Sequence, residues 1–214
     1  DGGGDPEKSV VAITQTGGMC RATNYVGMLR RGLAAAGFSQ VPVLAISAQG
    51  LESNPGFKMT PTIVNAALQG LILTDLLQNV LLRVRPYERD EGSAMALYQR
   101  WNALVCEFMT TPRYSAIEGR KLSFKWLCRQ MVHEFDELPL LDIPRKPRVG
   151  VVGEILVKFQ PDANNNLVDV IEDEGCEAVL PGLMGFFLQS METGDWRWEN
   201  FGLGRTSRHV KKMA

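Results

Sequence analysis

Residues 9–47 read SVVAITQTGGMCRATNYVGMLRRGLAAAGFSQVPVLAIS, in the order strand, glycine loop, helix, turn, strand. The apolar run VVAI is typical of a strand that is covered on both faces. Gly17 and Gly18 follow it, and paired glycines allow the backbone angles that tight loops need. Apolar residues then recur at helical spacing over 21–36, and 41–46 forms a second apolar run. The stretch predicts a right-handed βαβ unit whose loop lies at the carboxyl end of the first strand, where α/β proteins place ligands.

A second segment of the chain repeats this order. The apolar run at 148–153 predicts a buried strand, and a polar loop at 154–166 leads into a helix at 167–174 and a strand at 177–180. Two such units predict an α/β fold, a Rossmann-like and mostly parallel sheet. If the first and third strands lie side by side, the loops at their carboxyl ends meet in a crevice.

Between the two βαβ units, three helices are expected at 62–84, 93–108 and 117–135. They predict a helical lobe that is inserted into the α/β sheet. The first of them is too apolar for a surface helix, yet Asp75 and other polar residues interrupt it, which favours a buried helix over a membrane span. The expected organisation is a linker at 1–8, a first βαβ unit at 9–58, the helical lobe at 59–137, a second βαβ unit of the same α/β domain at 148–190, and a tail at 191–214.

Composition and charge exclude several classes of function. The 214 residues include 23 basic and 24 acidic side chains, so the net charge is −1 and no basic stripe supports nucleic-acid binding. Four cysteines with no CxxC pair, and no secretory signal, predict free thiols in a reducing cytoplasm. The glycine-rich start without Met indicates a piece of a longer protein. With two histidines and no HxxxH, a zinc site is not expected.

The predicted crevice combines polar residues of two loops. A glycine loop before a helix can bind an anion or can simply be a tight turn, and this one is neither GxGxxG nor a P-loop. In the second loop, the glutamate can be a ligand, a base or a helix cap, and the asparagines favour a turn. The candidate residues are Thr14, Thr16, Gly17, Gly18, Arg21 and Asn24 from the first loop, and Glu154, Lys158, Asn164 and Asn165 from the second.

Cys20 stands apart from the other three cysteines. It comes at the start of a predicted helix and precedes Arg21, and both the helix dipole and the guanidinium favour a thiolate. Such a sulfur can be a redox thiol or a metal ligand; the alternative is a small half-buried thiol that fills a turn. Cys106 and Cys128 are expected to pack inside their helices, and Cys176 to be structural.

Several stretches, taken together, resemble one known family. They are TQTGGMCRATNYVGMLRRGLAAAGFSQVPVLAIS, LESNPGFKMT, LLRVRPYE and VGVVGEILVKFQPDANNN. The chain resembles CoA-substrate-specific enzyme activase-related proteins, which are similar to the iron–sulfur subunits of 2-hydroxyacyl-CoA dehydratases. The resemblance implies a later segment of a large multidomain protein of anaerobic bacteria. In such proteins an ATPase module, which transfers electrons to a low-potential [4Fe–4S] cluster, lies earlier in the chain.

The function that this resemblance implies is a dehydratase-like α/β module. It would help to hold an iron–sulfur cluster or an acyl-CoA at the crevice, with Cys20 as the metal ligand from this segment. A [4Fe–4S] cluster takes several cysteines, so its site would be incomplete here. The implied partners are other domains of the same polypeptide, including the ATPase module, together with acyl-CoA. The wide apolar arc of the helix at 62–84 separately allows packing on a second copy of the chain. The alternative is a non-catalytic docking or scaffold domain whose apolar helical lobe is an interface.

Overall fold

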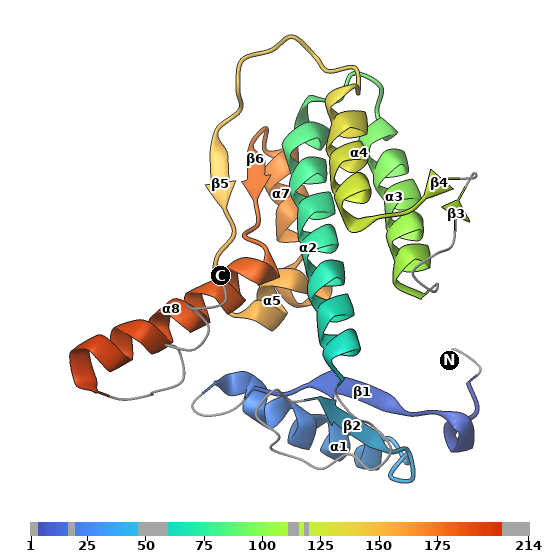
Figure 1. Cartoon of the computed structure of the whole chain (residues 1–214), viewed down its shortest axis with the longest axis vertical. Coiled ribbons are helices and arrows are strands. Elements are labelled where there is room, and N and C mark those ends of the chain that lie inside the picture. Colours follow the sequence, from blue (N-terminus) through green and yellow to red (C-terminus); the bar gives the residue numbers. More distant parts are fainter. Residues whose placement is uncertain (1–3, 17–19, 47–59, 111–115, 118–119, 203–214) are drawn as a thin grey trace. The chain divides into compact units, whose positions relative to one another are not determined.

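The computed structural model describes residues 4–16, 20–46, 60–110, 116–117 and 120–202 (Figure 1). The chain divides into two compact units, Asp1–Thr60 and Pro61–Ala214, and the two are described separately. It is mostly helical, at 64%, and holds two small parallel sheets of two strands each. This composition agrees with an α/β protein, the coarse class that the sequence predicts.

The first unit is the predicted βαβ unit. Strand β1 (Val11–Thr14) pairs in parallel with β2 (Val43–Ile46), and Val11 lies opposite Val43. Between them come a 3-10 turn, η2, and helix α1. Val26 of α1 is 1% exposed and Ala45 of β2 is fully buried, so the helix and the sheet share a small core. The bounds of the remaining elements are Pro6–Lys8 for η1, Arg21–Asn24 for η2 and Tyr25–Ala35 for α1.

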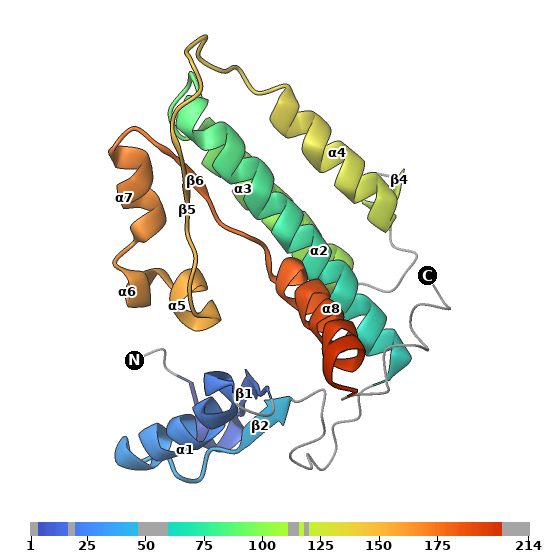
Figure 2. The ribbon, with the colours of Figure 1, turned by 90° about the vertical axis from the view of Figure 1, so that its left-hand side faces the viewer.

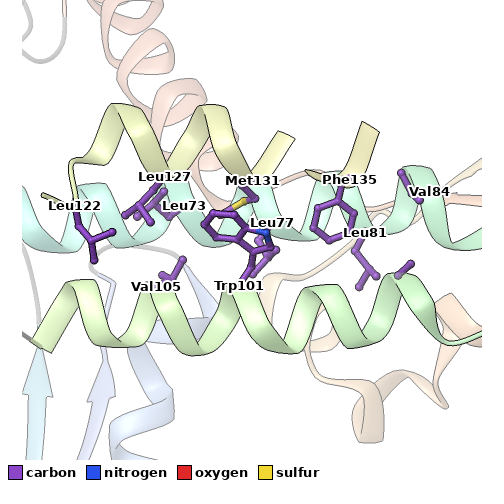
Figure 3. Packing of buried hydrophobic residues seen from close by; sticks show 11 residues of the cluster. Leu73, Leu77, Leu81, Val84, Trp101, Val105, Leu122, Leu127, Met131 and Phe135 are labelled. Atoms are coloured by element: carbon purple, nitrogen blue, oxygen red, sulfur yellow. The ribbon is translucent and has the colours of Figure 1, made fainter. Parts of the chain in front are cut away.

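The second unit begins with three long helices that share a core. Helix α2 contacts both α3 and α4, as the sequence predicts for a helical lobe (Figures 1 and 3). Trp101 and Phe135, each 1% exposed, pack with Leu77 of α2 at the centre of this core (Figure 3). The elements are α2 (Pro61–Val84), the 3-10 turn η3 (Arg85–Tyr87), α3 (Ser93–Thr110) and α4 (Phe124–Asp136).

A smaller α/β part follows in the same unit. Strands β5 and β6 pair in parallel, with Arg148 opposite Glu177, and Leu82 of α2 packs with Ile171 and Leu180 in a second core cluster. Figures 1 and 2 show β6 alongside α2, and α8 following β6 in the chain. The elements are β5 (Arg148–Gly150), α5 (Ile155–Phe159), α6 (Pro161–Asn164), α7 (Leu167–Asp173), β6 (Glu177–Val179) and α8 (Leu183–Phe201).

The structure corrects the prediction of one shared sheet. The four strands form two separate two-stranded sheets, and β5 is exposed along its length rather than buried. The reason is local. The paired part of β5 reads RVG, and apart from the glycine Val149 is its one apolar residue. A strand this short and polar does not supply the apolar run that a strand buried on both faces requires.

Three predicted boundaries also differ from the structure. Helix α4 begins at Phe124, not at 117, because the Ser123 hydroxyl accepts a hydrogen bond from the Trp126 N–H at 3.2 Å and so caps it there. The residues before this cap form a short antiparallel pair, β3 (Ala116–Ile117) with β4 (Arg120–Lys121). The loop at 154–166 contains α5 and α6, and the predicted tail is helical as far as the end of α8.

Helix α2, extended through η3, is long and apolar enough to cross a membrane by length and composition alone, with a mean hydropathy of 1.2. Core helices of soluble proteins meet the same criterion. Leu73, Leu77 and Leu81 of α2 are buried against α3 and α4, so one face of this helix belongs to a protein core.

Candidate functional site

The loop after β1 is held by two residues that the sequence reasoning passed over. The Gln15 N–H donates to the Ile46 carbonyl at 2.8 Å, and the Gln15 side-chain amide donates to the Thr23 carbonyl at 3.1 Å. The Thr23 hydroxyl donates in turn to the Thr16 carbonyl at 2.7 Å. These contacts tie the end of β1 to the start of the helical segment. The sequence signal for these contacts is the presence of polar Gln15 and Thr23 on either side of the glycine loop.

Two oxygen atoms in this loop are buried and have no hydrogen-bond partner among the described residues. They are the side-chain carbonyl oxygen of Gln15 and the hydroxyl oxygen of Thr16. Buried polar atoms are normally paired, and unpaired ones call for a water, an ion or a ligand. Gly17 and Gly18, which complete the predicted loop, lie outside the described residues.

Cys20 begins the helical segment, as predicted. It is the N-cap residue of η2, with φ −71° and ψ 136°, and its carbonyl accepts a hydrogen bond from the Thr23 N–H at 3.1 Å. The thiol makes no capping hydrogen bond and is exposed. Arg21 and Asn24 are exposed in the same turn, as is Thr14 at the end of β1. The thiol is therefore accessible at the start of the helix.

The other cysteines do not join Cys20. Cys106 is exposed on α3, which contradicts the prediction of burial, because Trp101 and Val105 take the core-facing positions of that helix. Cys128 is half-buried against the helical core, and burial raises the pKa of its thiol. Cys176 is half-buried and packs beside the second core cluster. No group of three or more His, Cys, Asp or Glu side chains placed to hold a metal ion occurs in the described part of the chain.

The second-loop candidates all have structural contacts within their own unit. Glu154 caps α5 by accepting a hydrogen bond from the Val157 N–H at 3.2 Å. The Lys158 ammonium donates to the Pro181 carbonyl at 3.0 Å and lies 4.5 Å from the centre of its neighbour's ring, that of Phe159. These contacts join the short helix α5 to the end of β6.

The two asparagines have similar roles in shaping the backbone. The Asn164 amide group donates to the Val157 carbonyl at 2.8 Å, and its oxygen accepts from the Leu167 N–H at 3.1 Å. Asn165 and Asn166 both have left-handed backbones, at φ 58° and 52°, a conformation that asparagine adopts more readily than most residues. The structure thus supports the turn interpretation of this loop, which belongs to a different unit from Cys20.

A buried carboxylate in the second unit, Glu177, binds the Tyr87 hydroxyl and two arginines, and the sequence reasoning treated it as part of a plain strand. It is 2% exposed. The Tyr87 hydroxyl donates to it at 2.8 Å, Arg145 donates to the same oxygen at 2.8 Å, and Arg148 lies 3.1 Å from the other oxygen. Burial alone would raise the pKa of Glu177, but these hydrogen bonds and the two positive charges outweigh it, so its pKa lies below the ordinary value.

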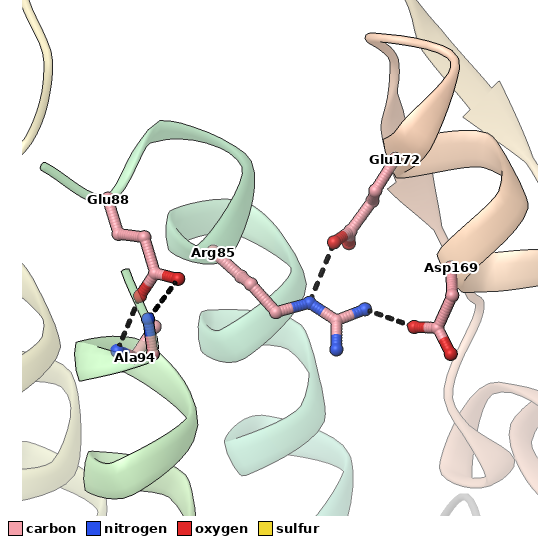
Figure 4. A network of polar contacts seen from close by, with 6 residues as sticks. Arg85, Glu88, Ala94, Asp169 and Glu172 are labelled. Carbon is pink, nitrogen blue, oxygen red and sulfur yellow. Dashed lines mark hydrogen bonds and ion pairs between the residues drawn. The ribbon is translucent and has the colours of Figure 1, made fainter. Parts of the chain in front are cut away.

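A second network joins η3 to α7 (Figure 4). Arg85 donates to Glu172 at 2.7 Å and to Asp169 at 3.1 Å. Burial raises the pKa of Glu172 despite the arginine beside it. Figure 4 also shows Glu88, whose carboxylate accepts from the Ala94 N–H at 2.7 Å and so caps α3. Both networks hold elements of the unit together, and the second carboxylate oxygen of Glu172 is buried without a hydrogen-bond partner among the described residues.

Comparison with known proteins identifies no relative of this chain. No protein-family model, curated protein or solved structure matches the chain.

Proposed function

We propose that this chain is a dehydratase-like, Rossmann-like module of a cytoplasmic protein related to 2-hydroxyacyl-CoA dehydratases and their activases. The proposal has its source in the resemblance of the sequence motifs. Its main structural support is the exposed Cys20 thiol, which begins a helical segment directly after the ligand-side loop of a parallel βαβ unit. Parallel pairing in both βαβ segments also supports a Rossmann-like arrangement.

In this proposal Cys20 supplies one sulfur ligand to an iron–sulfur cluster, and the remaining ligands come from outside the chain. The unpaired oxygens of Gln15 and Thr16 support a polar group or a water bound in the loop that precedes Cys20. An acyl-CoA at the same loop is the alternative occupant. When bound, the cluster would supply low-potential electron transfer, and this chain would contribute binding and orientation.

The test is anaerobic reconstitution of the full-length protein with iron and sulfide, followed by measurement of bound iron and the electron paramagnetic resonance spectrum after reduction. Cys20→Ala should lower the bound iron and change the spectrum. Cys106→Ala is the matched control, because Cys106 is also exposed but lies in the middle of a helix, and it should change neither. Equal iron and identical spectra for Cys20→Ala and the wild type would contradict the proposal.

The second candidate function is a non-catalytic docking or scaffold domain. The observation that favours it is the exposure of apolar side chains on two helices of the second unit. On the N-terminal half of α2, Val64, Leu68 and Ile72 are 37–46% exposed, and on α8 Phe187 and Trp196 are more than half exposed. Apolar surface of this kind is typical of interaction sites. Two results together would favour this function. Leu68→Asp would abolish binding of a partner protein, and Cys20→Ala would still bind iron.

A further inference from the structure

Helix α8 is packed differently from the other long helices of its unit. None of its described side chains is buried, whereas α3 and α4 bury Trp101 and Phe135 to 1% exposure. Its large apolar side chains instead face solvent: Phe187 is 51% exposed, and Phe201 is 63% exposed. Burial of an apolar face provides most of the stability of a protein helix, so α8 has little of that stabilisation.

The start of α8 is held by one side chain from α2. The Asp75 carboxylate accepts hydrogen bonds from the Leu183 N–H at 2.9 Å and the Met184 N–H at 2.7 Å. Asp75 is the only acidic residue in α2, and it interrupts an otherwise apolar stretch. The residue at the N-cap itself, Gly182, has no side chain that could make this contact.

Gly182 also fits the space that Asp75 leaves. A Cβ atom at this position would lie 2.5 Å from a carboxylate oxygen of Asp75, well inside the closest approach of real side chains. The backbone at the end of β6 therefore approaches α2 because a glycine is present. Asp75 and Gly182 are therefore in close contact, although they lie 107 positions apart in the chain.

From these observations we infer that α8 is an arm that opens by local unfolding as one segment, separately from the helical core, and that the Asp75 cap holds it folded at its contact with α2. Helices with few buried side chains open locally at much lower free energy than the core around them. The cap satisfies two N–H groups that have no partner within the helix, and a charged acceptor also interacts favourably with the helix dipole. Opening breaks both hydrogen bonds that join the start of α8 to α2.

Hydrogen exchange measured by mass spectrometry on the full chain tests this inference. In the wild type, amides of α8 should exchange much faster than those of α3 and α4. Asp75→Asn should speed exchange in α8 by roughly 5- to 30-fold, because the two N–H groups bind two different carboxylate oxygens and an amide has one acceptor oxygen and an NH2 donor in place of the other. Exchange in α3 and α4 should not change. Gly182→Ala should have the same effect, because its Cβ atom displaces Asp75 without removing the charge.

Glu88→Gln is the matched control, since Glu88 caps α3 in the same way but α3 carries core residues. It should speed exchange across α2, α3 and α4 together. The inference is overturned if α8 is as protected as the core helices, or if Asp75→Asn speeds exchange in the core helices as much as in α8.

Discussion

At the scale of single residues, the pairing of Glu177 is the contact most open to measurement. One carboxylate receives the Tyr87 hydroxyl and two guanidinium groups, and so joins η3 to β5 and β6. Breaking a buried charged contact costs more than the contact contributes, because the partners lose their compensation. Arg145 and Arg148 are more than half exposed, so water replaces part of what they lose.

Glu177→Gln should lower the free energy of unfolding by about 1–3 kcal/mol at neutral pH, the range for hydrogen bonds to charged groups. The folded-state pKa of Glu177 is below its ordinary value, so its charge stabilises the fold above about pH 4.3 and less as the pH falls further. In urea unfolding, the difference in the free energy of unfolding between variant and wild type should shrink as the pH falls below about 4.3.

A gap that stays constant with pH would show that the charge of Glu177 does not stabilise the fold. Asp90→Asn is the control, because the Arg89–Asp90 pair is exposed on both sides. It should leave the stability and its pH dependence unchanged.

At the scale of elements, helix α2 has two parts with different surroundings. Leu73 and Leu77 are buried between α3 and α4, whereas Leu68, nearer the start of the helix, is 46% exposed. The sequence predicts a buried helix over the whole stretch, because its apolar residues cover more than half of its circumference. Periodicity cannot tell which of these residues a neighbouring helix covers.

Leu77→Ala should lower the free energy of unfolding by about 2–5 kcal/mol, since it removes a fully buried side chain and leaves a cavity. Leu68→Ala, the same change on the same helix, should cost less than about 1 kcal/mol. Urea unfolding followed by tryptophan fluorescence compares them, because Trp101 lies in the core that Leu77 fills. Equal costs for the two variants would contradict this division of α2.

Helix α8 could not be predicted because its start depends on a residue far away in the sequence. Sequence rules look for an N-cap side chain at the helix start, and here that position is Gly182. The capping carboxylate belongs to Asp75. From its sequence neighbours alone, Asp75 is only a polar residue within an apolar helix. The apolar residues of α8 also lie on several faces, so no stripe indicates a helix.

At the scale of the whole molecule, local patterns predicted the parallel pairing within each βαβ unit and the three long helices, and the prediction that all four strands share one sheet was wrong. The first βαβ unit follows from an apolar run, a glycine loop and a helical period, all within 39 residues. Sharing of one sheet by β1 and β5 is a long-range property, and the described strands pair within their own units. For the candidate site, the sequence identified Cys20 but not Gln15 and Thr23, whose hydrogen bonds shape its loop.

The proposed function depends on Cys20 being a cluster ligand. The most direct measurement is whether reconstitution of the cluster protects the Cys20 thiol from alkylation. The full-length protein would be treated anaerobically with iodoacetamide before and after reconstitution with iron and sulfide, and each cysteine read by peptide mass spectrometry. The account predicts that Cys20 is alkylated in the iron-free protein and protected after reconstitution, while exposed Cys106 is alkylated equally in both. Equal alkylation of Cys20 before and after reconstitution would contradict it.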